Sequence, residues 1–148
     1  MGWLRGKRIY QNELLYLTRY YLKGDGNANS WELYLHHIHR PDVERAPHNH
    51  PWPWFLSIVL KGWYREVSVS LQDSAAKHPA FWDYKWVRWF NFMPRRSLFH
   101  RITTVPPKGA WTLVLVPPRA GVWGFAVNGK FIEYDERRHA VGTRVETF

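Results

Sequence analysis

The sequence contains no cysteine. Without thiols the chain can form neither disulfide bridges nor thiolate metal sites. This absence does not distinguish one cellular compartment from another. It does mean that any metal ion bound by the chain must be held by nitrogen and oxygen donors.

Long hydrophobic runs are also missing. No stretch approaches the ~20 consecutive apolar residues that a membrane-spanning helix needs. The first residues, Met-Gly-Trp-Leu-Arg, lack the apolar segment of a secretory signal. We therefore expect no membrane partner and a cytoplasmic location.

Several motifs of large enzyme classes do not occur. The sequence has no Gly-x-Ser-x-Gly, no P-loop and no Gly-x-Gly-x-x-Gly, so serine hydrolases, nucleoside triphosphatases and Rossmann enzymes have no support. No convincing long amphipathic helix is visible either. These gaps leave a protein built mainly from strands.

Acidic residues are few, with 12 Asp and Glu against 21 Lys and Arg, for a formal net charge of +9. Such a surface attracts phosphate, which raises the question of nucleic acid. The basic residues, however, are scattered over separate segments, and no recognition helix or zinc-finger spacing is present. We do not expect nucleic acid as the primary partner.

Aromatic residues are abundant: 10 Trp, 8 Tyr and 8 Phe make up 18% of the chain. Large rings fit best on packed sheet surfaces, and an aromatic excess would also suit a homodimer interface. The length of 148 residues is that of one domain. We expect a single domain over 1–148, with a core at roughly 14–134 and a polar tail at 135–148 that is a short helix or frayed.

Strand patterns recur between turn signals. Residues 14–23 and 31–39 flank a turn-rich segment and predict a hairpin. Residues 55–60, Gly62 and 64–71 predict a strand, a tight turn and a strand. Many short strands with frequent turns are typical of a sandwich or barrel. Further strands are expected at 82–92, 99–105, 111–116, 123–127 and 131–134, the last two joined by Asn128-Gly129.

Histidines occur on both faces of the expected strand at 31–39. Side chains of a strand alternate between two faces. One face carries Leu33, Leu35, His37 and His39, and the other carries Glu32, Tyr34, His36 and Ile38. His78 falls in an expected surface loop at 72–83, where a solvated side chain is the simplest interpretation.

The segment His48-Asn49-His50-Pro51-Trp52 precedes an apolar strand. Two histidines one residue apart place their imidazoles on the same side of the backbone. A third histidine from a neighbouring strand, His100, would complete three neutral nitrogen donors and leave coordination positions open for water or substrate. The alternatives are a chance pairing or a pair that caps a loop by hydrogen bonding. A fourth ligand could come from His36, His37, His39 or Glu66.

The order of these features resembles the cupins, the RmlC-like family of double-stranded β-helix barrels. Their first motif has His-x-His, then a strand and a glycine turn, as at His48, His50, 55–60 and Gly62. Their second motif has a proline-containing turn followed by one histidine, as at 94–100. The resemblance implies an all-β, single-domain jelly-roll barrel.

A narrower resemblance is to uncharacterised small cupins of phage and bacterial genomes, which have no settled reaction. Trp54 and Phe55 stand where the cupin pattern places a metal-ligating glutamate. The remaining three-histidine set is similar to that of thiol dioxygenase-like cupins. Being neutral, it would favour an anionic substrate or a bound hydroxide. The segments that match are His48-x-His50-Pro51-Trp52, 57–62, His100-Arg101-Ile102, 111–115 and 123–125.

We therefore expect a divalent metal cofactor, which could be iron, zinc, nickel or manganese. Iron would support dioxygenase chemistry on a small molecule, and the other ions would act as Lewis acids for isomerisation or hydrolysis. Tyr64, Glu66 and Arg101 are the candidate catalytic residues, with Arg88 as a second candidate anion clamp.

Two alternatives stay open. A metal-free isomerase would use His48 or His100 as its base, together with a carboxylate and a tyrosine acid. A non-catalytic cupin would bind a metal or a small ligand, or would serve as a structural module, for example in a phage particle.

Overall fold

In the computed structural model, the described residues are 4–24, 29–43, 46–75, 82–94, 98–134 and 142–148. This part of the chain is almost entirely strand, as its aromatic and turn-rich composition predicts. Its elements are β1 (Gly6–Gln11), β2 (Leu14–Lys23), β3 (Glu32–Ile38), β4 (Phe55–Lys61), β5 (Tyr64–Ser70), the 3-10 helix η1 (Asp73–Ala75), β6 (Asp83–Val87), β7 (Phe90–Met93), β8 (Leu98–Thr104), β9 (Ala110–Val116), β10 (Gly124–Val127), β11 (Lys130–Glu133) and β12 (Thr143–Thr147).

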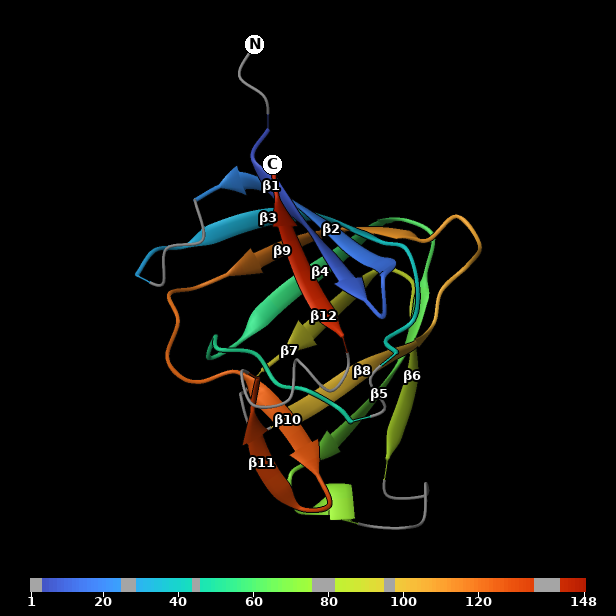
Figure 1. Cartoon of the computed structure of the whole chain (residues 1–148), viewed down its shortest axis with the longest axis vertical. Helices are drawn as coiled ribbons and strands as arrows, with labels where there is room; N and C mark the ends of the chain where they lie inside the picture. Colours follow the sequence, from blue (N-terminus) through green and yellow to red (C-terminus); the bar gives the residue numbers. More distant parts are fainter. Residues whose placement is uncertain (1–3, 25–28, 44–45, 76–81, 95–97, 135–141) are drawn as a thin grey trace.

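The strands form three antiparallel sheets within the described ranges. The large sheet has the order β12-β1-β2-β3-β9-β4-β7, and the smaller ones have the orders β6-β5-β8 and β10-β11. Figure 1 shows the large sheet in the upper part of the molecule and the two small sheets below it. Residues of both layers line a common cavity, which is the arrangement of a jelly-roll barrel.

Alternation along the strands separates the core from the surface. On β3 the predicted face of Glu32, Tyr34, His36 and Ile38 is buried, whereas the opposite face is only partly covered. On β9 the alternate residues from Ala110 to Val116 are buried in the same way. The interior is therefore a mixture of apolar packing and a polar stripe that faces the cavity.

Two predicted connections are confirmed. Strands β2 and β3 form the expected hairpin, with Tyr20 opposite Leu35. Asn128 and Gly129, with φ of 50° and 79°, join β10 to β11. Positive φ at both central residues is what a type I′ hairpin turn requires, and Asn-Gly adopts it at low cost.

The turn at Gly62 has a function that its sequence did not reveal. Gly62 has a φ of 81°, and a Cβ there would run into the carbonyl oxygen of Gly109. The strands on either side do not pair with each other, because β4 belongs to the large sheet and β5 to a small one. The tight turn therefore carries the chain from one layer to the other.

Two expectations are wrong. The stretch 82–92 is not one strand: β6 pairs with β5 and β7 pairs with β4, with the break at Arg88 and Trp89. Aromatic residues continue across the break, so the sequence did not reveal the change of sheet.

The polar tail is neither helical nor frayed over residues 143–147, because β12 pairs with β1 and sets Val145 opposite Ile9. The sheet thus extends beyond the predicted core at both ends of the chain. The remaining tail residues 135–141, His78 and the turn residues 95–97 lie outside the described residues. Among those described, no helix is long and apolar enough to span a membrane.

Candidate metal centre

The segment that carries the histidine pair is fixed by hydrogen bonds on both sides. The amide of His48 donates to the carbonyl of His100 at 2.9 Å, and the amide of His100 donates back at 2.8 Å. Between the two histidines, the side-chain oxygen of Asn49 accepts the amide of Gly124 at 2.8 Å. Because neighbouring side chains point in opposite directions, this anchor of Asn49 leaves His48 and His50 facing the cavity.

The structure brings the three predicted histidines together. One ring nitrogen from each of His48, His50 and His100 lies within 4.8 Å of the others. The Nε2 atoms of His50 and His100 are 2.7 Å apart. Burial, and then the neighbouring His100 and His48, hold the pKa of His50 well below its ordinary value. A neutral imidazole is the form that binds a metal ion.

Glu66 lies behind His100 and not inside the cluster. Its fully buried carboxylate is 2.8 Å from Nδ1 of His100, and it also accepts a hydrogen bond from Asn91 at 2.9 Å. Lys85 lies 3.3 Å away. Burial alone would raise the pKa of Glu66, but His100, Lys85 and Asn91 outweigh burial and lower it.

An ionised Glu66 sets the tautomer of His100. A carboxylate can only accept, so Nδ1 of His100 must carry the hydrogen and Nε2 keeps its lone pair toward the cluster. This pairing of a carboxylate with a ligating histidine is common around metal ions and raises the basicity of the ligand. Glu66 thus orients a metal-ligand candidate.

Of the other candidate catalytic residues, Tyr64 lines the cavity and the two arginines do not. Tyr64 is buried, lines the cavity, and receives a hydrogen bond from Asn91 at 3.1 Å. Burial, and then Glu66, raise the pKa of Tyr64, so its phenol keeps its proton. Arg101 and Arg88 are not among the described residues that line the cavity, and Arg88 instead lies 5.9 Å from the ring of Trp86.

The histidines of β3, and His39 just after this strand, are separate from the cluster. His36 lies on another wall of the cavity, where its Nε2 accepts a hydrogen bond from Nε of Arg19 at 2.9 Å. His37 contacts the carbonyl of Lys108 at 3.1 Å, and His39 contacts the hydroxyl of Thr18 at 2.9 Å. Over the described ranges, only His48, His50 and His100 form a group that could hold a metal.

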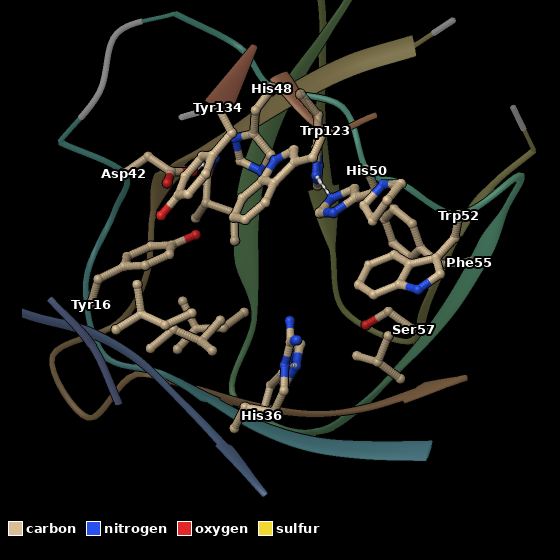
Figure 2. Close-up of a pocket in the computed structure, with 18 of the residues that line it drawn as sticks. Tyr16, His36, Asp42, His48, His50, Trp52, Phe55, Ser57, Trp123 and Tyr134 are labelled. Carbon is tan, nitrogen blue, oxygen red and sulfur yellow. Dashed lines mark hydrogen bonds between the residues drawn. The ribbon is translucent and has the colours of Figure 1, made fainter. Parts of the chain in front are cut away.

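The cavity has a volume of about 460 Å³. Its walls also contain residues that the sequence did not single out. For Phe55 and Ser57 on β4, the signal that could have found them is alternation, because both are buried and Leu56 between them is not. Figure 2 shows Tyr16, His36, Asp42, Trp52, Phe55, Ser57, Trp123 and Tyr134 around the same space as His48 and His50.

The residues of the cluster fit a divalent metal ion. All three donors are imidazole nitrogens, which suit iron, zinc, nickel and similar ions. Without a cation between them, the Nε2 atoms of His50 and His100 can stay 2.7 Å apart only if one of them carries a hydrogen that it donates to the other. With a cation, both lone pairs would point to the same ion.

Comparison with known proteins supports the fold. No family model matches the chain, and no curated protein matches it. Among solved structures, Fe(II)-HppE with the alternative substrate (S)-1-HPP has a TM-score of 0.51 at 14% identity, over 75% of this chain and 55% of that chain. FeII HppE has a TM-score of 0.50 at 14% identity, and the match covers 75% of this chain and 56% of that chain. Hydroxypropylphosphonic acid epoxidase from S. wedmorenis in complex with fosfomycin has a TM-score of 0.47 at 14% identity, and the match covers 69% of this chain and 51% of that chain.

The likeness concerns the fold, because all three identities are 14%. The present chain spans only about half the length of these proteins. The two layers of strands described above, together with the likeness to the two HppE structures with TM-scores of 0.51 and 0.50, establish an all-β cupin jelly roll. The predicted fold class is confirmed, whereas the RmlC-like subtype and the narrower phage and bacterial group stay predictions.

Proposed function

We propose that the protein is a metal-dependent enzyme of dioxygenase or isomerase type that acts on a small, anionic molecule. The observation that carries this proposal is the convergence of His48, His50 and His100 on a cavity of about 460 Å³. Small-molecule sites typically measure about 300–1,000 Å³, so the cavity can surround a compact substrate. Fe(II) in a neighbour of the same fold makes iron a reasonable first candidate.

The surrounding residues have definite tasks in this proposal. When bound, iron would supply oxygen chemistry, and zinc, nickel or manganese would supply Lewis acidity. Glu66 holds the Nδ1 proton of His100 and fixes its ring. Tyr64, protonated and positioned by Asn91, can donate a proton or a hydrogen bond into the cavity. Trp52 and Phe55 provide apolar wall that keeps water from the site. Arg101 stays a predicted catalytic residue without a place on the cavity wall.

A second candidate is metal-free acid–base catalysis. The chain of contacts from Glu66 through His100 to His50, at 2.8 Å and 2.7 Å, is also what a histidine base oriented by a carboxylate would need. Tyr64 would then be the acid. The metal-free route uses the same residues as the metalloenzyme. His100 would be a proton acceptor in the metal-free route and a metal ligand in the metalloenzyme.

Elemental analysis of the purified, tag-free protein separates the two. We expect near-stoichiometric divalent metal in the wild type and none in the triple variant His48→Ala, His50→Ala, His100→Ala. The matched control is His37→Ala with His39→Ala, which removes two histidines outside the cavity and should keep the metal. Absence of metal from the wild type, even after refolding with excess iron, zinc or manganese, would reject the metalloenzyme and favour the metal-free route.

We also propose that the protein pairs as a homodimer in the cytoplasm. Strand β7 lies at an edge of the large sheet, and its Phe90 and Phe92 are exposed, as is Ile58 on the adjacent β4. An edge with exposed apolar side chains is a common pairing surface. Light scattering should give twice the mass of 17.8 kDa, and Phe90→Lys should return the monomer.

A further inference from the structure

A row of polar side chains crosses the large sheet and faces the cavity. Lys7 on β1 lies opposite Arg19 on β2, Arg19 lies opposite His36 on β3, and His36 lies opposite Thr112 on β9. All four line the cavity. A cross-strand row places neighbouring side chains about 5 Å apart at Cβ, so the two cations of this row are held close together.

Arg19 is held in one orientation. Its Nε donates to His36 at 2.9 Å, and its guanidinium lies 4.3 Å from the centre of the Tyr34 ring. Burial, and then Arg19 and Lys7, hold the pKa of His36 well below normal, so His36 stays neutral and can accept this hydrogen bond. The terminal nitrogens of Arg19 donate to no described residue in the hydrogen bonds of the structure, which leaves a planar pair of donors for another partner.

A third cation reaches the cavity from a loop that is tied to the histidine segment. Arg119 lies between β9 and β10 and lines the cavity. The amides of Ala120 and Gly121, just after it, donate to the carbonyl of Pro51 at 2.8 Å and 3.1 Å. Since Pro51 follows His50 directly, these bonds hold Arg119 beside the segment that carries two metal-ligand candidates.

The three cations outnumber the acidic groups that act on them. Glu32, buried and bonded by Tyr34, is the carboxylate that affects both Lys7 and Arg19. Asp42 is a second carboxylate; it lines the cavity and accepts hydrogen bonds from Gln11 and from the amide of Ile102. The three cations still outnumber these two carboxylates.

We propose that Lys7, Arg19 and Arg119 form a binding site for a doubly charged oxyanion on the part of the cavity wall that is built from β1, β2 and the loop after β9. This inference deepens the proposed function and rests on it for the role of the site: the oxyanion would anchor one end of the substrate, while its other end meets His48, His50 and His100. A forked guanidinium and an ammonium match the oxygens of a phosphate-like or sulfate-like group.

The titration of Lys7 agrees with this arrangement. Burial, and then repulsion by Arg19 and Arg119, lower the pKa of Lys7 from 10.5 to about 8. Cations that repel each other inside a cavity are relieved by an anion placed between them. The excess charge is therefore a feature that ligand binding would compensate.

Sulfate titration of the metal-free protein tests the proposal directly. The protein is the wild type, stripped of metal by a chelator and kept in chloride buffer of constant ionic strength, and binding is followed by calorimetry and by thermal melting. We expect saturable sulfate binding at least 10-fold tighter than binding of singly charged nitrate. Lys7→Met and Arg119→Met should each weaken sulfate binding about 10-fold or more, and Arg19→Met should abolish it.

Matched controls replace cations outside the cavity. Lys23→Met and Arg40→Met should leave sulfate binding unchanged, since both residues are exposed and neither lines the cavity. Arg19 packs against Tyr34, so its variant is interpreted only if circular dichroism shows a folded sheet; Lys7→Met and Arg119→Met keep the test decisive if it does not.

The outcomes also separate this inference from the proposed function. Equal sulfate and nitrate affinities, or sulfate binding that survives Lys7→Met and Arg119→Met, overturn the anion site even if the wild type contains metal. Sulfate binding that depends on the three cations supports the site even if the wild type proves metal-free, in which case only the metalloenzyme fails.

Discussion

The protein has two groups of histidines, one inside the barrel and one outside, and they differ in what their nitrogens do. In the inner group, the Nε2 atoms of His50 and His100 face each other, and Nδ1 of His100 is hydrogen-bonded to the carboxylate of Glu66. In the outer group, the rings of His37 and His39 lie 3.9 Å apart, but their Nε2 atoms contact Lys108 and Thr18.

Closeness of imidazoles is therefore not what distinguishes a metal site. The outer rings are closer to each other than the inner ones, whose centres are 4.9 to 5.2 Å apart. The outer pair uses its nitrogens to hold the sheet surface together, and His37 also stacks on Trp111. In the inner group, one nitrogen of each ring lies within 4.8 Å of the others, and a buried carboxylate orients the ring of His100.

The sharpest test of this contrast is the loss of one histidine at a time. His50→Ala and His100→Ala should each weaken binding of nickel or cobalt by more than ~100-fold, because even the partners of ligands are worth about 10–100-fold. His37→Ala and His39→Ala should leave the affinity unchanged. Calorimetric titration of the metal-free proteins measures all four, and equal losses from both groups would contradict the assignment.

The next largest effect should come from the carboxylate behind His100. Glu66→Gln keeps the shape of the side chain but removes the charge that fixes the Nδ1 proton, so metal affinity should fall about 10–100-fold. Glu146→Gln is the matched control, because Glu146 is an exposed carboxylate on β12. An unchanged affinity in Glu66→Gln, measured in the same titration, would show that His100 needs no orienting partner.

A packing change at the outer group should alter stability without altering metal content. Gly109 has a φ of 74°, and a Cβ there would meet the carbonyl oxygen of Ile38 and lie 3.0 Å from Nε2 of His37. Gly109→Ala should destabilise the fold by about 1–3 kcal/mol or more in urea unfolding. Its metal-to-protein ratio should equal that of the wild type, and a lower ratio would mean that the two groups are coupled.

The smallest effect concerns acid stability. Burial, and then His37 and Arg40, lower the pKa of His39 from 6.5 to about 4. Between these values an unfolded chain binds a proton at His39 and the folded chain does not, so stability falls as the pH drops from 6.5 toward 4. His39→Gln should flatten that part of the curve and leave stability at pH 8 comparatively unaffected. An unchanged slope in urea unfolding across this window would refute the shift.

Most of the fold could be predicted from the sequence, because the strongest sequence signals are local. Asn128-Gly129, the pairing of β2 with β3 and the alternation on β3 depend on residues that are close along the chain, and all appear as predicted. The change of sheet at Arg88 and Trp89 and the pairing of β12 depend on distant strands. Local patterns cannot specify those partners.

The residues of the site also differ in whether local sequence patterns could predict them. His48 and His50 follow a two-residue spacing, and His100 came from the order of strands, so all three could be named in advance. Glu66 was named as well, but as a possible ligand, since only the pairing of β5 with β8 sets it beside His100. Lys7, Arg19 and Arg119 come from different segments of the sequence. In the sequence alone each resembles an ordinary surface cation, because only the pairing of the strands and the loop after β9 bring them to one cavity.

The pairing of β1 with β12 has a consequence for how the molecule is made. Lys7 lies on β1 and Thr143 on β12, and both line the cavity. Strand β1 is synthesised well before its outer neighbour β12. A nascent chain would thus carry the histidines before it could close the wall that holds Lys7, and contacts between such distant segments form slowly, on a scale of about milliseconds to seconds. The proposed anion site would therefore be complete only after β12 has been synthesised.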